Sequence, residues 1–173
     1  MTMLFTGGLP ETRCGGGSTL ATTEHIRAVL PGLLRDIGAR TLLDAPCGDL
    51  NWVSTVDLGV KYIGVDYDPT HLAGKSGFLL VRDIITDDLP KADLMLCRDF
   101  YQHWPNRFVF RALENFLRSG IPWLLATSHA NSVNDDIDKS GGFRALNLRS
   151  APFNLPEPKW QTDDPPGSKR ILG

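Results

Sequence analysis

The chain has 173 residues, which fits a single domain on the usual range of about 100 to 200 residues. It carries 18 Lys and Arg against 20 Asp and Glu, so a formal net charge of −2 argues against a long nucleic-acid tract or an anionic membrane as partner. A hydrophobic fraction of 42% and a charged fraction of 22% exclude a disordered or fibrous chain and predict one that folds alone.

The three cysteines, Cys14, Cys47 and Cys97, are odd in number and widely spaced. This pattern argues against a disulfide framework and contains no C-x-x-C pair for zinc, so we expect no metal site. No apolar stretch reaches the roughly 20 residues that span a bilayer, and residues 1–10 lack the basic start of a secretion signal. We therefore expect a cytoplasmic protein without a membrane partner.

A glycine cluster at 15–17 marks the end of the first segment of the chain. Consecutive glycines do not hold regular structure, but they can lie close to a ligand or another backbone. We expect residues 1–17 to be a flexible N-terminal segment and residues 18–173 to form one domain.

An amphipathic helix is predicted next, with Ser18 or Thr19 as its N-cap and Gly38 as its end. Its apolar residues recur at helical spacing: Ile26, Val29, Leu30, Leu33, Leu34 and Ile37. Pro31 interrupts this pattern, and proline is poorly tolerated inside a helix. We expect either a kink or two abutting helices.

Four short apolar strands follow, and each ends near an aspartate. They are expected over 41–48, 62–66, 78–83 and 93–99. A helix over 106–119, ended by Gly120, leads to a fifth strand around 123–127, and 144–148 is a candidate sixth strand. Apolar strands separated by helical or linking stretches predict an α/β fold of the Rossmann-like type, with a doubly wound, mostly parallel sheet in one compact domain.

In such sheets ligands bind outside the carboxyl ends of the strands, where Asp44, Asp66 and Asp83 are expected. An acid before the Gly48 turn suits an ammonium group and is not part of the G-x-G-x-x-G dinucleotide pattern. Asp66 suits a ribose diol, because a carboxylate accepts both hydroxyl hydrogens. Asp83 can accept from an exocyclic amine while Ile84 packs on a flat ring, or it can cap a turn. Amine, ribose and adenine together describe S-adenosylmethionine.

These residues resemble class I S-adenosylmethionine-dependent methyltransferases, in particular a bacterial and phage group whose acceptor is mostly unassigned. The motifs that carry the resemblance are Leu42-Leu43-Asp44-Ala45-Pro46-Cys47-Gly48-Asp49 with Trp52, residues 62–66, Asp83-Ile84, Cys97-Arg98-Asp99 with Gln102-His103, and Asn147-Leu148 with Pro152-Phe153. The resemblance covers roughly residues 15 to 158. It implies a Rossmann-like fold and transfer of a methyl group from S-adenosylmethionine to an acceptor, which we expect to be a small molecule.

The resemblance also implies roles for individual residues. We expect the cofactor to be bound by Asp44, Pro46, Gly48, Asp66, Tyr67, Asp83, Ile84 and Arg98. Asp99 and His103 are the expected catalytic residues facing the acceptor. A general base is needed only for a hydroxyl or a protonated amine, and either His103 or His129 after the fifth strand could supply it.

Three features depart from the family's pattern. Leu50 stands where the family usually has a third small residue, and only a stub over 69–74 replaces the helix after the second strand. The sequence ends at Gly173, which puts the final hairpin in doubt. Two alternatives therefore stay open: a hydrolase or lyase that degrades S-adenosylmethionine, and a non-catalytic module that binds it.

Overall fold

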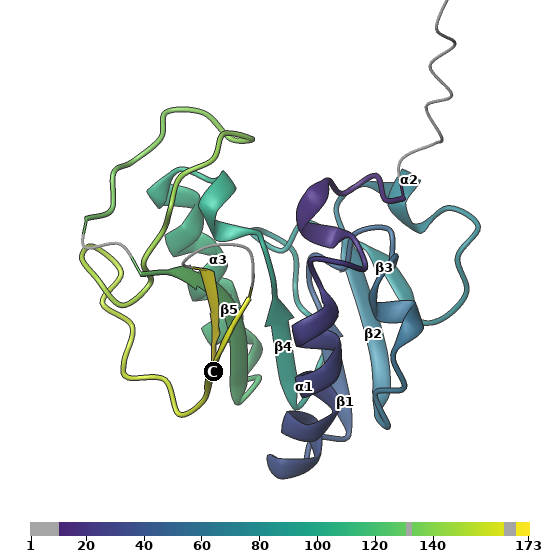
Figure 1. Ribbon diagram of the computed structural model, residues 1–173. Helices are drawn as coiled ribbons and strands as arrows, with labels where there is room; N and C mark the ends of the chain where they lie inside the picture. Colours follow the sequence, from purple (N-terminus) through teal and green to yellow (C-terminus); the bar gives the residue numbers. More distant parts are fainter. Residues whose placement is uncertain (1–10, 131–132, 165–168) are drawn as a thin grey trace, which may run out of the picture.

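The chain forms one seven-stranded sheet, in a computed structural model that describes residues 11–130, 133–164 and 169–173 (Figure 1). The strands are β1 (Thr41–Asp44), β2 (Lys61–Asp66), β3 (Leu79–Val81), β4 (Leu94–Cys97), β5 (Trp123–His129), β6 (Gln161–Asp163) and β7 (Lys169–Leu172). Their order is β3-β2-β1-β4-β5-β7-β6, with the first five parallel and β7 antiparallel to both of its neighbours. The predicted Rossmann-like, mostly parallel sheet is confirmed.

Helices flank the sheet (Figure 1). They are α1 (Glu24–Asp36), α2 (Pro69–Leu72) and α3 (Asn106–Ser119), with the short 3-10 helices η1 (Gly16–Ser18), η2 (Val53–Thr55) and η3 (Tyr101–His103). Among the residues that the structure describes, no helix is long and apolar enough to cross a membrane.

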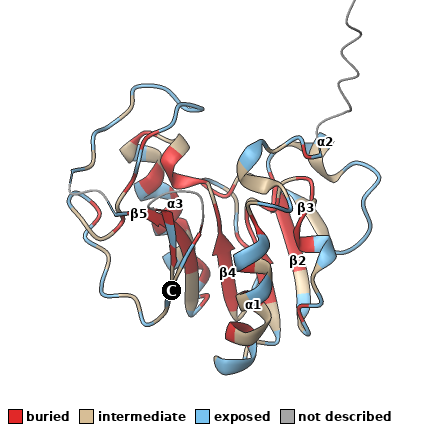
Figure 2. Cartoon of the chain, in the orientation of Figure 1, coloured by how far each residue is buried: buried red, intermediate tan, exposed pale blue. Residues whose placement is uncertain are grey.

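Two hydrophobic clusters lie on opposite faces of the sheet, because side chains alternate along a strand. In β4, Leu94 and Leu96 belong to the cluster beneath α1, whereas Met95 and Cys97 belong to the cluster that contains the apolar face of α3. All four side chains are buried, and Figure 2 shows β4 as a buried central strand. The continuous apolar run read from the sequence therefore reflects a strand that is covered on both faces.

Helix α1 begins later than predicted and continues through Pro31. The N-cap position is Thr23, and Ser18 lies in the separate helix η1, so the expected caps at Ser18 or Thr19 are wrong. The alternative of two abutting helices is also wrong. The buried side chains Ile26 and Leu30 precede Pro31, and two buried leucines follow it, so packing against the sheet holds both halves in one helix.

The strand predictions hold for β1 but not for residues 144–148. β1 closes at Asp44, as expected for the acid before the Gly48 turn, and the one helix between it and β2 is the short η2. Residues 144–148 do not form a strand, although Leu146 O accepts the N–H of His129 at 2.8 Å. The edge of the sheet is completed instead by the hairpin of β6 and β7, which the sequence analysis left in doubt.

A polar residue in the core joins α3 to the loop after β3. Asn115 is 2% exposed, and its Nδ2 donates to the carbonyl oxygens of Ile84 at 2.9 Å and Asp87 at 2.8 Å. Its Oδ1 accepts from Arg118. The loop after β3 has no helix of its own, so these hydrogen bonds supply part of its anchoring.

We expect Asn115→Ala to lower the free energy of unfolding by about 1 to 3 kcal/mol, because two backbone carbonyls lose their partner. The exposed neighbour provides a control: Glu114→Ala should change stability by no more than about 0.5 kcal/mol. Urea denaturation of both variants measures the difference. Equal stability of the two would show that Asn115 does not anchor the loop.

Candidate functional site

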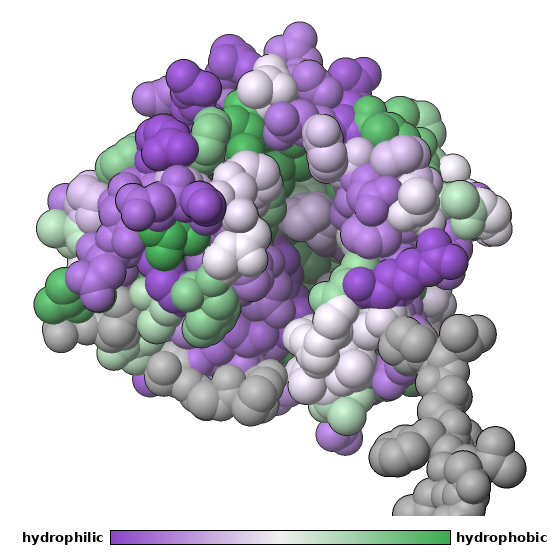
Figure 3. Space-filling view, turned by 90° about the horizontal axis from the view of Figure 1, so that it is seen from above, coloured by the Kyte–Doolittle hydropathy of each residue, from purple (hydrophilic) through white to green (hydrophobic). Residues whose placement is uncertain are grey.

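A cavity of about 820 Å³ opens at the carboxyl ends of β1, β2, β4 and β5. Seen from this end of the sheet, the surface is hollowed near its centre (Figure 3). The cavity is lined by Cys14, Gly15, Gly16, Gly17, Ser18, Thr22, Asp44, Pro46, Cys47, Gly48, Trp52, Asp66, His71, Arg98, Asp99, Phe100, Gln102, His103, Trp104, His129, Phe143 and Lys169.

Most of the predicted site residues meet in this cavity. They are Asp44, Pro46, Gly48, Asp66, Arg98, Asp99 and His103. Tyr67, Asp83 and Ile84 do not line it. Tyr67 is 74% exposed and Ile84 is a core residue. Asp83 Oδ1 accepts the N–H of Ile85 at 2.8 Å, which is the turn-capping alternative considered for it above.

Asp44 ends β1 and is almost completely enclosed, with 2% of its surface exposed. Its Oδ2 accepts the hydroxyl of Tyr62 at 2.8 Å. Burial raises the pKa of Asp44 to about 7, an effect that the Tyr62 hydrogen bond and the charge of Arg98 only partly oppose. The carboxyl is therefore poised between its neutral and ionised forms near neutral pH.

Asp66 ends β2 and holds the turn after β1. Its Oδ2 accepts the backbone N–H of Gly48 at 2.8 Å, and its Oδ1 accepts the N–H of Asp68 at 2.9 Å. His71 Nδ1 lies 3.1 Å from the same Oδ1, which brings α2 into the cavity wall. Gly48 has a φ of 58°, a left-handed conformation that glycine adopts without strain. The two strand tips are thus fixed to each other through this turn.

The segment before α1 packs on the turn after β1. Thr12 Oγ1 lies 3.0 Å from both carboxylate oxygens of Asp49, and the N–H of Arg13 donates to Asp49 Oδ2 at 2.8 Å. Residues 1–10 of the expected flexible segment lie outside the described residues, so the flexibility of 1–17 stays a prediction.

The glycine cluster itself forms part of the cavity wall, as its freedom to approach another group suggested. A Cβ on Gly17 would lie 2.7 Å from Asp99 Oδ2, too close for any larger residue without movement. The carbonyl oxygen of Gly17 accepts from Arg98 at 2.7 Å. Gly17 therefore packs directly on the tip of β4.

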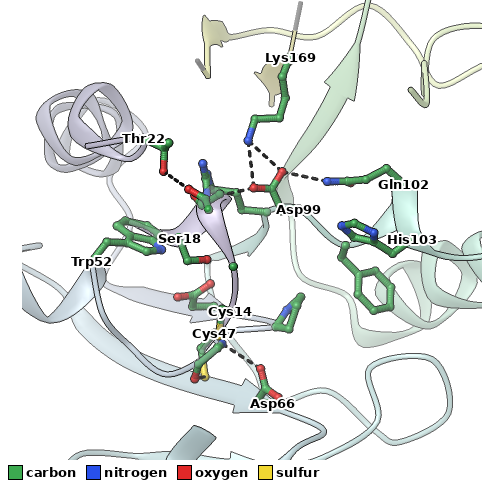
Figure 4. A pocket seen from close by; sticks show the side chains of 18 of the residues that line it. Cys14, Ser18, Thr22, Cys47, Trp52, Asp66, Asp99, Gln102, His103 and Lys169 are labelled. Carbon is green, nitrogen blue, oxygen red and sulfur yellow. Dashed lines mark hydrogen bonds and ion pairs between the residues drawn. The ribbon is translucent and has the colours of Figure 1, made fainter. Parts of the chain in front are cut away.

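Four charged side chains meet beside this tip. Asp164, fully buried, receives Arg98 Nη2 at 3.0 Å and lies 3.1 Å from Lys169 Nζ. Lys169 Nζ also donates to Asp99 Oδ2 at 2.9 Å (Figure 4). A single buried charge would cost several kcal/mol, but two positive and two negative groups compensate one another here. The cluster connects the last hairpin to β4.

Asp99 is held in an uncommon conformation, with a φ of 55°. Its N–H donates to Thr127 Oγ1 at 2.9 Å, and its Oδ1 accepts from Gln102 Nε2 at 2.9 Å. Burial alone would raise the pKa of Asp99, but the charges of Arg98 and Lys169 outweigh burial and hold that pKa below its usual value. Asp99 is therefore ionised at neutral pH.

The two histidines of the cavity differ in the contacts of their rings. His103 Nδ1 lies 2.7 Å from the carbonyl oxygen of Gly142, which can only accept, so Nδ1 carries the hydrogen and Nε2 keeps its lone pair. His129 Nδ1 lies 3.2 Å from the backbone nitrogen of Leu146 and 3.3 Å from its carbonyl oxygen, so it can accept from the first or donate to the second. Burial lowers the pKa of His129. Of the two candidates, His103 is the one whose contacts fix a tautomer with Nε2 left to take up a proton.

Several lining residues were not assigned a role from the sequence. Trp52 and Gln102 belong to the motifs that carry the family resemblance, and those motifs could have identified them as site residues. His71 lies in the stub that was treated as a missing helix. Lys169 comes from the last hairpin, beyond the motifs, and no pattern in the sequence marked it. Among the described residues, no group of three or more His, Cys, Asp or Glu side chains could hold a metal ion.

Comparison with known proteins connects this geometry to one class of fold. No protein-family profile matches the chain, and no curated protein matches it significantly. Solved structures do match. Magnesium protoporphyrin IX methyltransferase (ChlM) from Synechocystis, with bound S-adenosylmethionine, matches with a TM-score of 0.59 and 10% identity over 88% of this chain and 78% of that chain. The chain has the fold of a methyltransferase.

Two further structures support this assignment of the fold. The mitomycin 7-O-methyltransferase MmcR matches with a TM-score of 0.58 and 15% identity, over 92% of this chain and 61% of that chain. Human N-acetylserotonin methyltransferase, in complex with S-adenosylmethionine, matches with a TM-score of 0.50 and 16% identity, over 62% and 34%. This chain thus spans about a third of the human enzyme and less than two thirds of MmcR.

The raised pKa of Asp44 makes the stability of the fold depend on pH. Between pH 3.8 and about 7 the folded chain keeps a proton that the unfolded chain has released. The stability contributed by this bound proton is fully present below pH 3.8 and is lost as the pH rises through 7. An amide does not ionise, so the variant Asp44→Asn does not lose this stability. Its free energy of unfolding, relative to that of the wild type, should therefore rise by about 2 to 4 kcal/mol between pH 4 and pH 8.

Urea unfolding of Asp44→Asn and the wild type at the two pH values measures this gain. Asp57→Asn, at an exposed position, is the matched control for loss of one carboxylate. A stability difference between Asp44→Asn and the wild type that stays constant with pH would contradict the raised pKa.

Proposed function

We propose that this chain is an S-adenosylmethionine-dependent methyltransferase that acts on a small molecule. One observation carries the proposal: Asp44 and Asp66, at the tips of neighbouring strands, face the same cavity as the Gly48 turn. The fold is shared with methyltransferases that were solved with S-adenosylmethionine bound. The volume of about 820 Å³ lies within the range of about 300 to 1,000 Å³ that is usual for ligand pockets.

The side chains present fit the chemistry of this cofactor. Within the described part of the chain, Asp44 Oδ1 accepts no hydrogen bond, so it is available to an ammonium group. Among the described residues, Asp66 Oδ2 accepts only the N–H of Gly48, so its second lone pair can accept a ribose hydroxyl. Pro46, Gly48 and Arg98 complete the proposed binding wall.

The contacts expected of the remaining predicted residues stay predictions. Tyr67 follows β2, and Asp83 and Ile84 follow β3, which pairs with β2 at the edge of the sheet. We propose Asp83 and Ile84 for the adenine end of the cofactor and Tyr67 for a further contact with it, on the strength of the sequence analysis.

The proposed mechanism divides positioning from proton removal. When bound, S-adenosylmethionine supplies a methyl group on a positively charged sulfur, and the methyl–sulfur bond breaks with its electron pair passing to sulfur. Holding the acceptor atom in line with that bond, about 3 to 3.5 Å away, contributes several kcal/mol. The lone pair of an acceptor hydroxyl forms the new bond, and its proton passes to Nε2 of His103. Asp99 orients the acceptor as an ionised hydrogen-bond acceptor.

Removing the charge of Asp66 tests the cofactor site. We expect Asp66→Asn to weaken S-adenosylmethionine binding by about 1 to 3 kcal/mol, because hydrogen bonds to a charged acceptor are lost. Titration calorimetry measures the dissociation constant, with Asp57→Asn as the control of unchanged affinity. Wild-type affinity in Asp66→Asn would remove Asp66 from the proposed site, and no binding to the wild type would refute the proposed function.

Replacing the proposed base separates catalysis from binding. We expect His103→Gln to leave cofactor affinity unchanged and to lower turnover by about 10² to 10⁴ for a hydroxyl acceptor. His129→Gln should have a smaller effect on turnover, because burial lowers the pKa of His129 and makes it a weaker base.

Incubation with methyl-labelled cofactor and a cell lysate provides the assay for both variants. Transfer leaves S-adenosylhomocysteine and a labelled acceptor, whereas methylthioadenosine without a labelled acceptor would indicate the degrading enzyme considered above. A wild-type rate in His103→Gln would exclude His103 as the base.

A further inference from the structure

One neutral polar atom in the cavity wall is buried without a partner. Gln102 is 2% exposed and lies in η3, and its Oε1 has no hydrogen-bond partner among the described residues. A buried acceptor without a partner keeps the full cost of its desolvation. Because Gln102 lines the cavity, a ligand that donates a hydrogen bond would remove this cost.

The orientation of the Gln102 amide is fixed by its neighbour. Nε2 lies 2.9 Å from Asp99 Oδ1, and an ionised carboxylate can only accept (Figure 4). The opposite amide orientation would set two acceptors against each other. Oε1 is therefore the free atom, and it can only accept. This part of the cavity thus offers one carbonyl oxygen that calls for an O–H or N–H donor, next to a carboxylate that already has Gln102, Arg98 and Lys169 as partners.

The walls around this pair are aromatic. Phe100 and Trp104 flank η3, with ring centroids 5.5 Å apart. Phe143 lies 5.9 Å from the ring of His103 and 5.9 Å from that of His129, and yet it is 67% exposed. A large apolar side chain exposed at the wall of a pocket is typical of a ligand-binding surface. Flat rings on several sides favour a planar ligand.

The charges of the cavity do not favour an anionic ligand at this end. Arg98 and Lys169 are both engaged by Asp99 and Asp164, and Asp164 is fully buried. An added phosphate or carboxylate would have to displace one of these pairs. The atom that still lacks a partner here is Gln102 Oε1, which can bind only a hydrogen-bond donor.

We propose that Gln102 is the residue that selects the acceptor, and that the acceptor is a planar aromatic compound with ring hydroxyl or amino groups. One donor of the ring binds Gln102 Oε1, while the face of the ring packs on Phe143 and Trp104. This inference rests on the proposed function, since it concerns the second substrate of the same cavity.

Catechol, a planar ring with two hydroxyls, is the probe. The full chain is saturated with S-adenosylhomocysteine, and binding is measured by ligand-observed NMR. We expect catechol to bind at least about tenfold more tightly than 1,2-dimethoxybenzene, which is planar without donors, and than cis-1,2-cyclohexanediol, which has donors without a flat ring. Equal binding of catechol and 1,2-dimethoxybenzene would overturn the role of the donor, and equal binding of the diol would overturn the role of the ring.

Variants at Gln102 identify the atom. Gln102→Met removes the carbonyl and should weaken catechol binding by about tenfold. Gln161→Met, at an exposed position on β6, is the matched control and should behave as the wild type. Wild-type catechol affinity in Gln102→Met would overturn the proposal.

The affinity for S-adenosylhomocysteine separates this inference from the proposed function. Normal affinity in Gln102→Met shows that the variant is folded, so a loss of catechol binding then belongs to the acceptor site. Binding of S-adenosylhomocysteine to the wild type with no binding of catechol would refute the acceptor class and leave the proposed function standing. If S-adenosylhomocysteine itself does not bind, the proposed function fails. Catechol is then titrated on the chain alone, where the same dependence on Gln102 is expected.

Discussion

The cavity depends on charge compensation at the tip of β4. Arg98, Asp99, Asp164 and Lys169 are buried or nearly so, and each has an opposite charge within about 3 Å. Burying one member without its partners would cost several kcal/mol, so the four side chains stabilise the fold only as a set. This requirement fixes the last hairpin against β4, and through Gly17 it also fixes the segment that precedes α1. The walls of the cavity come from parts of the chain that are far apart in sequence.

Loops replace helices around much of the site. The link from β2 to β3 has only the single turn of α2, and the link from β3 to β4 has no helix. The loop after β5 is held over η3 by Arg144, which is 8% exposed and donates to Trp104 O at 2.9 Å and Asn106 Oδ1 at 2.8 Å. Asp136 in the same loop accepts the first N–H of α3 at 2.8 Å. Arg144 is therefore a structural anchor of this side of the cavity.

The features that could be predicted from the sequence are those set by local pattern. Apolar runs that end in acids identified β1 and β2, and Asp44 and Asp66 do lie together because parallel strands end at one edge. Asp83 carries the same local signal and yet caps a turn, since β3 is short and its loop is held by its own hydrogen bonds. Lys169 had no signal at all, because its partner Asp99 is 70 residues away and its partner Asp164 follows the neighbouring strand β6. Contacts of this kind are fixed by sheet order, which local periodicity does not encode.

The two ends of the cavity differ in the charges that surround their carboxyl groups, Asp44 at β1 and Asp99 at β4. Asp44 accepts from a neutral partner, Tyr62, and the charge of Arg98 does not offset its burial. The pKa of Asp44 is therefore raised to about 7. Asp99 has two cations beside it and is already ionised. A ligand ammonium would therefore gain most at Asp44, where it completes an ion pair, and little at Asp99. A neutral donor such as a hydroxyl suits the carbonyl oxygen of Gln102, whose orientation is set before any ligand arrives. The electrostatics of the fold thus favour the charged part of the proposed ligand at β1 and an uncharged hydrogen-bond donor at β4.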